Sequence, residues 1–403
     1  MSGPGAAGPG APGGPPVRVV CFSGYTANLR ARALADRLRG LGWDVTESRG
    51  RGRRTTAWEI VATVLPNCWL ALTMRADLAL GCKPHPNVTL PLAICRRRGI
   101  PTWLDVDDLD HEYRPGVAGR LVAWLQRPHP RRADVVSYHH PLLRTHLVEG
   151  LGCDPGRTLA VPQGVHADRF ARPRAPLARH DGRPRVVFAA HLNLACDLDV
   201  VLAAWPGVLA HRPTAVLTVV GGGARLGEFR RAVRARGVHR SVELVGEVRP
   251  DEVPAYLAGA DVAVAWATDR RVNRHRCSLK LREYLAAGVP VVCNDVGELR
   301  DFAAVTYQVP DGGDALVDQI VRLLDGEGDG REAEGRRLAR DLDWHPIVRA
   351  AAEAVAQRLD LPAPSVEAER PPAPAAAASA VAHPPGTAVP VTLVPGAPRQ
   401  PAG

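Results

Sequence analysis

Short apolar segments alternate along most of this chain with longer segments of helical periodicity, and no other feature restricts the fold as much. The first apolar run, 17–23, precedes a helical pattern over 28–41 in which Leu29, Leu34 and Leu38 recur at helical spacing. Consecutive strands joined by helices pair in parallel, because a parallel connection needs a crossover of roughly a dozen residues. The pattern predicts an α/β fold with doubly wound parallel sheets. Further strands are expected at 76–80, 102–106, 133–137 and 158–161.

The alternation breaks at a stretch that contains several proline and arginine residues, and then it restarts. Strands are expected again at 185–190, 215–220, 242–245 and 261–265. At 403 residues the chain is long enough for two domains. The ends, 1–16 and 361–403, carry few large apolar residues, so we predict that both are disordered. Between them we expect a first domain (17–165), a linker (166–184), a second domain (185–344) and a last helix (345–360).

Charge and cysteine content limit the class of partner and the compartment. A net charge of +9 suits phosphorylated small molecules or an anionic membrane surface. No basic run is interleaved with aromatic residues, so we expect no nucleic-acid partner. Eight cysteines without a C-x-x-C pair favour a reducing, cytoplasmic location, and residues 1–16 lack the pattern of a signal peptide. The most apolar segment, 62–74, contains Pro66 and is shorter than the roughly 20 residues of a membrane span.

The segment 277–294 carries the clearest functional pattern. It predicts a helix that Ser278 caps, that carries Lys280 and Glu283 on one face, and that Gly288 ends before a buried strand. A cation at such a site suits a diphosphate, and a carboxylate suits the vicinal hydroxyls of a ribose. A surface ion pair of the helix is the structural alternative. The segment therefore indicates a binding site for a nucleoside-diphosphate sugar.

This segment resembles the nucleotide-binding helix of the retaining GT-B glycosyltransferases of family 4, or group 1, whose signature is two glutamates separated by seven residues. The segments 219–223, 242–248 and 260–264 occur in the order of that family, and 161–166 is similar to its interdomain hinge. The resemblance implies two Rossmann-like domains that face each other across a cleft, with the last helix packed back on the first domain. It also implies metal-independent transfer of a sugar to an acceptor hydroxyl, with no further cofactor.

Carried over residue by residue, the resemblance makes Glu283 the ribose ligand and puts Lys280 and Ser278 at the diphosphate. It also implies that Gly24 and Asn28 line the reacting face. The glycine turn 221–223, with Gly222 at its centre, would let the nucleotide approach the backbone.

Three signature positions differ from the family. His191 and Cys196 stand where the family has an arginine and a lysine, and His275 replaces the first glutamate. We expect Lys280, helped by Arg274 or Arg282, to bind the phosphates instead. We also expect His275 to lie near the donor sugar, where its protonation would strengthen donor binding as the pH falls from about 8 to 6. The alternatives are a non-catalytic binding or assembly partner and a nucleotide-sugar epimerase.

Other polar segments leave their roles open. Asp105 and Asp107 share a face of the strand 102–106 and its extension, where they could hold a metal ion, bind sugar or acceptor hydroxyls, or serve the fold. Lys83 and His85 follow the preceding strand and should face the same cleft. No complete zinc spacing occurs, and we expect no metal site. The basic amphipathic pattern 119–132 could lie on a membrane, but we expect it to be a buried helix; peripheral membrane contact and the identity of the acceptor stay open.

Overall fold

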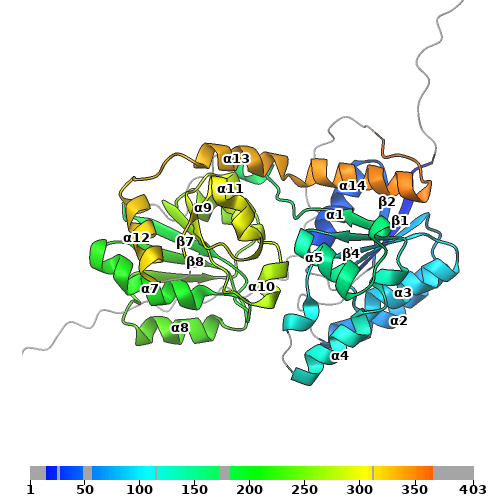
Figure 1. Ribbon diagram of the computed structural model, residues 1–403, viewed down its shortest axis with the longest axis horizontal. Coiled ribbons are helices and arrows are strands. Elements are labelled where there is room, and N and C mark those ends of the chain that lie inside the picture. The colour runs from blue at the N-terminus through cyan, green and yellow to red at the C-terminus, as the bar shows by residue number, and fades with distance from the viewer. Residues whose placement is uncertain are drawn as a thin grey trace, which may run out of the picture. The chain divides into compact units, whose positions relative to one another are not determined.

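The structure is a computed structural model that describes residues 15–24, 28–48, 57–113, 116–171, 182–310 and 313–365 (Figure 1). The predictions of disordered ends, at 1–16 and 361–403, fall almost wholly outside these residues. Within the described part of the chain, no helix is both long enough and apolar enough to cross a bilayer.

The first sheet has six parallel strands in the order β2-β1-β3-β4-β5-β6. Buried apolar side chains pack on both faces of this sheet, as expected for a doubly wound arrangement. Its strands are β1 (Arg18–Ser23), β2 (Asp44–Glu47), β3 (Leu78–Cys82), β4 (Thr102–Val106), β5 (Val135–Tyr138) and β6 (Thr158–Ala160). Its main helices are α1 (Leu29–Gly40), α2 (Ala57–Thr73), α3 (Pro86–Arg97), α4 (Gly116–Gln126) and α5 (Pro141–Thr145).

The second sheet repeats this architecture with the parallel order β12-β11-β10-β7-β8-β9. It too buries apolar residues on both faces. Its strands are β7 (Arg185–Ala189), β8 (Val216–Val220), β9 (Val242–Gly246), β10 (Val262–Ala265), β11 (Val291–Cys293) and β12 (Tyr307–Gln308). Its helices are α7 (Leu198–His211), α8 (Leu226–Ala235), α9 (Val253–Leu257), α10 (Arg271–His275), α11 (Leu279–Ala287), α12 (Gly313–Leu324) and α13 (Glu332–Asp341), and a 3-10 segment, η5, spans Gly297–Val305.

Helix α14 (Trp344–Leu359) follows the second sheet in sequence but packs in the core of the first. Its buried residues Val348, Ala352 and Val355 share one apolar cluster with Leu34 and Leu38 of α1, and the two helices lie side by side in Figure 1. The side chain of Asp343 caps α14 by accepting a hydrogen bond from the amide of His345. Each large apolar side chain buried here contributes roughly 1.5–3 kcal/mol, so the crossover is firmly anchored.

Two parallel doubly wound sheets were predicted, and the structure confirms this fold class. The prediction for the segment 119–132 was wrong, because α4 is not a buried helix. Its apolar residues Val117, Leu121 and Trp124 are exposed, Trp124 by 69%. An amphipathic pattern indicates an apolar face but does not indicate what covers it.

Candidate functional site

Helix α11 carries the two residues that the sequence singled out for the donor. The Ser278 hydroxyl caps it by accepting a hydrogen bond from the amide of Leu281 at 3.3 Å, and Gly288 ends it with φ of 67°, a left-handed conformation that glycine adopts without strain. Lys280 and Glu283 are both partly buried. Neither makes a hydrogen bond or an ion pair within the described part of the chain. The helix therefore holds a cation and a carboxylate that the fold itself does not neutralise.

The Lys280 ammonium lies against the second sheet, 4.3 Å from the ring centre of Phe188 on β7. Burial and, to a smaller extent, the nearby positive charge of Arg276 together lower the pKa of Lys280 to about 8. An anion at this position would relieve both effects. Lys280 is thus placed and charged as a residue that binds a phosphate.

Glu283 lies one turn further along α11, close to the short helix α6 (Asp168–Ala171). Burial raises the pKa of Glu283 to about 7, and the positive charge of Arg169 opposes this rise. A carboxylate with this pKa is only partly ionised at neutral pH. A hydroxyl ligand that donates hydrogen bonds would stabilise its charged form.

The arginines expected to assist Lys280 have other partners. Arg282 is buried and donates two hydrogen bonds to Glu298, at 3.0 and 2.9 Å, and Arg274 pairs with Asp269 on the surface. Arg276 was not singled out from the sequence, but it fits the role better. Its charge acts on Lys280 and also on Asp108 of the first domain, and it makes no hydrogen bond or ion pair with the described residues. The only sequence signal was its place in the basic run directly before the helix cap.

His275 contacts the first domain. Its Nδ1 lies 2.8 Å from the carbonyl oxygen of Arg271, and its ring meets the edge of the His146 ring at a centroid distance of 6.3 Å. A third ring, that of His111, lies 6.3 Å beyond His146. Because Arg271 also pairs with Glu112 at 3.3 Å, α10 is held to the first domain by rings and charges together. A role of His275 at the donor sugar stays a prediction.

The remaining donor-side positions differ in their exposure. His191 is exposed at the end of β7, where a ligand could reach it. Cys196 is only 3% exposed in the core of the second sheet, and burial raises the pKa of its thiol. The thiol therefore supplies no negative or positive charge at neutral pH. Of the two substituted phosphate positions, only His191 is accessible to a ligand.

The glycine turn after β8 is required by packing. A side chain on Gly221 would collide with the carbonyl oxygen of Ala190, and one on Gly222 would come within 2.8 Å of the Cβ of Glu247. The Gly222 carbonyl accepts a hydrogen bond from the amide of Leu192 at 2.9 Å. The turn thus joins the loops that follow β7 and β9, and a role in nucleotide binding stays a prediction.

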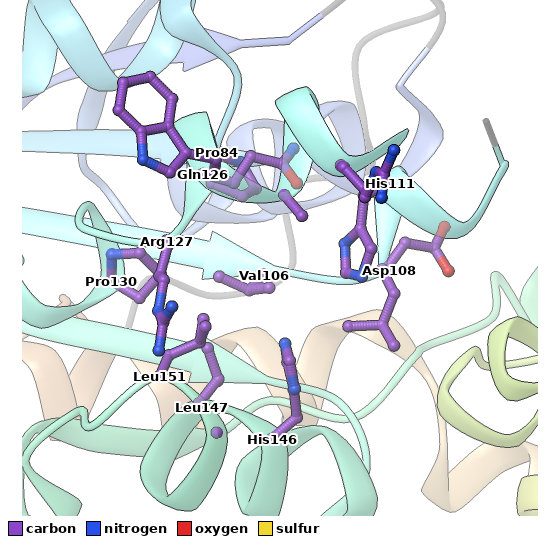
Figure 2. Close-up of a pocket in the computed structure, with 15 residues that line it drawn as sticks. Pro84, Val106, Asp108, His111, Gln126, Arg127, Pro130, His146, Leu147 and Leu151 are labelled. Carbon is purple, nitrogen blue, oxygen red and sulfur yellow. The ribbon is translucent and has the colours of Figure 1, made fainter. Parts of the chain in front are cut away.

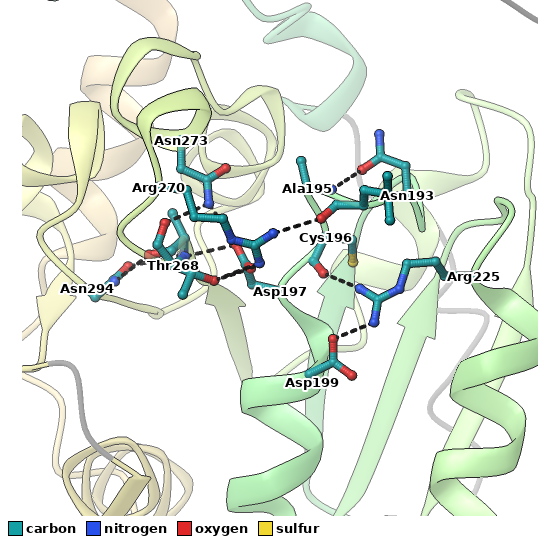
Figure 3. A network of polar contacts seen from close by, with 12 residues as sticks. Asn193, Ala195, Cys196, Asp197, Asp199, Arg225, Thr268, Arg270, Asn273 and Asn294 are labelled. Carbon is teal, nitrogen blue, oxygen red and sulfur yellow. Dashed lines mark hydrogen bonds and ion pairs between the residues drawn. The ribbon is translucent and has the colours of Figure 1, made fainter. Parts of the chain in front are cut away.

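A network around Asp197 shapes the loops at the carboxyl ends of β7 and β10 (Figure 3). The Asp197 carboxylate is 2% exposed and accepts hydrogen bonds from Thr268, Arg270 and Asn273, at distances that include 2.9, 2.6 and 3.0 Å. These contacts fix the segment that leads into α10 and then to Arg276. The sequence gives no signal for this role of Asp197, because its partners lie more than 70 residues away.

In the first domain, Gly24 and Asn28 flank a loop, 25–27, that lies outside the described residues. Asn28 caps α1 by accepting a hydrogen bond from the amide of Ala31 at 3.1 Å. A Cβ on Gly24 would stand 2.8 Å from the Cδ2 atom of His85, so only glycine fits this close approach. Both residues have structural roles here, and their place at the reacting face stays a prediction.

The carboxylates at the end of β4 and in the segment after it pair with basic side chains. Asp105 is fully buried and pairs with Arg30 at 2.7 and 2.9 Å. Lys83, buried and with φ of 70°, lies 2.9 Å from Asp107. It also lies 3.4 Å from Asp108 and 3.1 Å from Asp110. Lys83 and the acidic segment therefore meet, as the sequence indicated.

His85 joins the same group, with its Nε2 3.7 Å from a carboxylate oxygen of Asp110. A left-handed lysine is strained, and the surrounding carboxylates hold it in place. Within the described residues, no group of three or more His, Cys, Asp or Glu side chains is arranged to hold a metal ion.

Solved structures with the same fold include glycosyltransferases and a related synthase. HepE of Anabaena, solved in complex with UDP and glucose, superposes with a TM-score of 0.65 at 14% identity, over 85% of this chain and 100% of that one. Sucrose-phosphate synthase from Thermosynechococcus elongatus gives 0.67 at 17% identity, over 84% and 98% of the two chains. At this identity the likeness shows the fold alone.

Two curated relatives are more similar in sequence. A GDP-mannose-dependent alpha-(1-6)-phosphatidylinositol monomannoside mannosyltransferase of Mycobacterium tuberculosis is 31% identical over 228 residues, which are 51% of this chain and 58% of that protein. An alpha-monoglucosyldiacylglycerol synthase of Streptococcus pneumoniae is 23% identical over 181 residues, 41% of this chain and 40% of that one. The match to each relative thus spans less than two thirds of its length.

Family models match the two halves of the chain in succession. A glycosyl transferase 4-like domain matches residues 11–164, and a domain described as glycosyl transferases group 1 matches residues 183–326. The two matches correspond to the first and the second parallel sheet. Fold and sequence therefore agree, and the chain belongs to the group 1 glycosyltransferases with the GT-B fold.

Proposed function

We propose that this glycosyltransferase moves a sugar from a nucleoside diphosphate to an acceptor hydroxyl, with retention and without a metal ion. One observation carries the proposal: Lys280 and Glu283 make no hydrogen bond or ion pair in the described chain, whereas Arg282 between them pairs with Glu298. Partly buried charges without partners are costly, and a ligand that supplies the opposite groups removes the cost. A diphosphate and a ribose are such groups. Retention is proposed from the resemblance of segment 277–294 to the retaining members of the family.

In this proposal Lys280 and Arg276 bind the two phosphates, and Glu283 accepts hydrogen bonds from the ribose hydroxyls. As the bond to the sugar breaks, negative charge grows on the departing diphosphate, and fixed cations stabilise it. His191, exposed after β7, could add a further hydrogen bond. The cations act at the point where charge develops, so they lower the barrier rather than only the substrate Kd.

Metal independence rests on the partners of the carboxylates. Asp105 is neutralised by Arg30 and also accepts a hydrogen bond from Ser137 at 2.5 Å, and Asp107 lies 2.9 Å from the ammonium of Lys83. A Mg²⁺ ion would have to displace these cations. We expect activity to survive dialysis against EDTA, and loss of activity that Mg²⁺ restores would refute this part of the proposal.

The acceptor is proposed to be a lipid, reached at a membrane surface. The curated relatives are named for phosphatidylinositol monomannoside and for glucosyldiacylglycerol. Helix α2 exposes Val61, Leu65, Trp69 and Leu72 at helical spacing, and α4 exposes a second apolar stripe. Exposed apolar stripes, of which the one on α4 lies beside the exposed Arg120 and Arg127, suit peripheral binding to an anionic bilayer. The cytoplasmic location stays a prediction, which the eight free thiols support.

The test of the proposal is a donor screen followed by a transfer assay. UDP, GDP and their glucose and mannose derivatives are added to the protein, and the melting temperature is recorded. The stabilising donor is then incubated with lipid acceptors, and the anomer of the product is determined by NMR. Stabilisation by one nucleotide and transfer with retention are expected, and the absence of stabilisation by any nucleotide would refute the proposal.

A second candidate function is nucleotide-sugar binding without catalysis. It is favoured by Cys196, a buried neutral thiol at a position where the family has a lysine. A protein with this site could bind a nucleotide sugar and not turn it over. It would be recognised by donor binding without transfer to any acceptor. An epimerase would instead change the sugar with donor alone and release no diphosphate.

A further inference from the structure

A cavity of about 340 Å³ lies in the first domain, away from α11 (Figure 2). It is enclosed by the end of β4, the 3-10 turn η1 (Asp110–Tyr113), α4 and the short π-helix η3 (His146–Gly150). Its volume is at the lower end of the range for ligand pockets. None of the residues proposed for the donor lines it.

The walls of the cavity are mostly apolar. Figure 2 shows Val106 near Leu147 and Leu151 in the lining, and Ala123 and Trp124 of α4 also line the cavity. Burial lowers the pKa of His146 to about 4, so this lining imidazole is neutral at physiological pH. A chain of methylene groups would meet complementary surface here.

The arginines of the lining belong to the exposed side of α4. Arg120 on this helix and Arg127 directly after it are both exposed. Their stems can line an apolar wall while their guanidinium groups stay in solvent. Because α4 also exposes Leu121 and Trp124, the cavity opens beside a surface that is both apolar and basic. Lipid with an anionic headgroup matches both properties.

The cavity wall meets the second domain at His146, whose ring lies at a centroid distance of 6.3 Å from the ring of His275 on α10. The cavity also has a polar end. Asp108 lies there, 3.4 Å from the ammonium of Lys83 and 3.3 Å from the hydroxyl of Tyr113. The charge of Arg276 acts on this carboxylate, and the same charge acts on Lys280 of the proposed donor site. A molecule whose chain fills the cavity would therefore present its polar head on the side of the donor phosphates.

We propose that this cavity binds the apolar chain of a lipid acceptor, with the headgroup hydroxyl directed past Asp108 to the donor. The role of the bound lipid as acceptor rests on the proposed function, but binding of the lipid chain can be tested without donor or turnover. It commits to a lipid chain that enters beside α4. The alternative occupant is an apolar segment of this same chain. If such a segment filled the cavity, added lipid chains would not bind.

The test measures binding of alkyl glucosides to the full chain by calorimetry, at concentrations below micelle formation. Methyl, hexyl and octyl glucoside share one headgroup and differ only in the chain. We expect no measurable binding of methyl glucoside and a Kd that falls from hexyl to octyl by up to about fourfold per added methylene. Ala123→Phe fills the cavity and should weaken octyl glucoside binding about tenfold or more.

Leu125→Trp, on the same helix but outside the lining, is the matched control and should bind like the wild type. If Ala123→Phe lowers the melting temperature, Ala123→Leu provides a smaller obstruction at the same place. Equal affinity of Ala123→Phe, Leu125→Trp and wild type would overturn the proposal, and so would a Kd independent of chain length. Nucleotide binding is measured on the same variants. Its absence from the wild type would refute the proposed function and leave the cavity result standing.

Discussion

Donor affinity should depend on pH through Lys280 and Glu283, with an optimum between about pH 7 and pH 8. Burial lowers the pKa of Lys280 to about 8, so the ammonium is lost as the pH rises above that value. Burial raises the pKa of Glu283 to about 7, so the carboxylate is lost as the pH falls below it. Phosphates need the ammonium and ribose hydroxyls prefer the carboxylate, so both changes weaken donor binding.

The size of each effect follows from the two pKa values. If only the ammonium form of Lys280 binds phosphate, its population falls from about 90% at pH 7 to about 10% at pH 9, and the Kd rises about tenfold. Protonation of Glu283 should raise the Kd about fivefold between pH 7 and pH 6 on the same reasoning. These are upper limits, since neutral forms retain part of the binding.

Calorimetry with the stabilising nucleotide sugar measures both limbs, because its diphosphate diester does not titrate in this range, and the Lys280→Arg variant separates loss of the ammonium from ionisation of the nucleobase near the upper end. Lys280→Arg should remove the upper limb, since a guanidinium stays charged at every pH used. Glu283→Gln should remove the lower limb. Arg274→Gln, which removes an exposed cation paired with Asp269, is the control and should keep both limbs.

A flat wild-type profile would refute the reasoning, and so would an upper limb that persists in Lys280→Arg. Affinity that continues to strengthen down to pH 6 would instead favour the role at the donor sugar that the sequence suggested for His275. The two expectations differ in sign below pH 7, so one titration separates them.

Three further predictions concern stability and membrane contact. Asp105→Asn should lower the free energy of unfolding by about 3–5 kcal/mol in urea titrations, because Arg30 would be left buried without its partner; a loss below about 1 kcal/mol would contradict this. Gly221→Ala should reduce stability by about 1–3 kcal/mol, seen as a lower melting temperature, because φ is 139° and the new Cβ meets a backbone oxygen; an unchanged melting temperature would be the contrary result. Trp69→Ser and Trp124→Ser together should weaken sedimentation with phosphatidylglycerol vesicles about tenfold or more and leave neutral phosphatidylcholine vesicles largely unbound; equal sedimentation of variant and wild type would argue against this membrane face.

Local patterns were sufficient for the fold. The strand predicted at 102–106 has the same bounds in β4, because Trp103, Leu104 and Val106 form a short apolar segment between polar turns. The meeting of Lys83 with the acidic segment was also predictable, since the carboxyl ends of adjacent parallel strands lie at one edge of the sheet.

Which charges are free could not be read from the sequence. Arg274, Arg276 and Arg282 belong to one basic segment, and only tertiary contacts distinguish them. Glu298 on η5 pairs with Arg282, and no residue of the described chain pairs with Arg276. The exposure of the apolar face of α4 could not be predicted either. Periodicity shows that a helix has an apolar face, but it does not show whether protein or lipid lies against that face.

The contact between Glu283 and the ribose is the central claim, and a double-mutant cycle tests it most directly. The Kd of the preferred nucleoside diphosphate and of its 2′,3′-dideoxy analogue is measured for wild type and Glu283→Ala. If the carboxylate binds the ribose hydroxyls, each single change should cost about 1.5–3 kcal/mol, and the second change should cost little more once the first is made. Fully additive losses, or a wild-type affinity indifferent to removal of the hydroxyls, would place Glu283 outside the donor site and contradict the account.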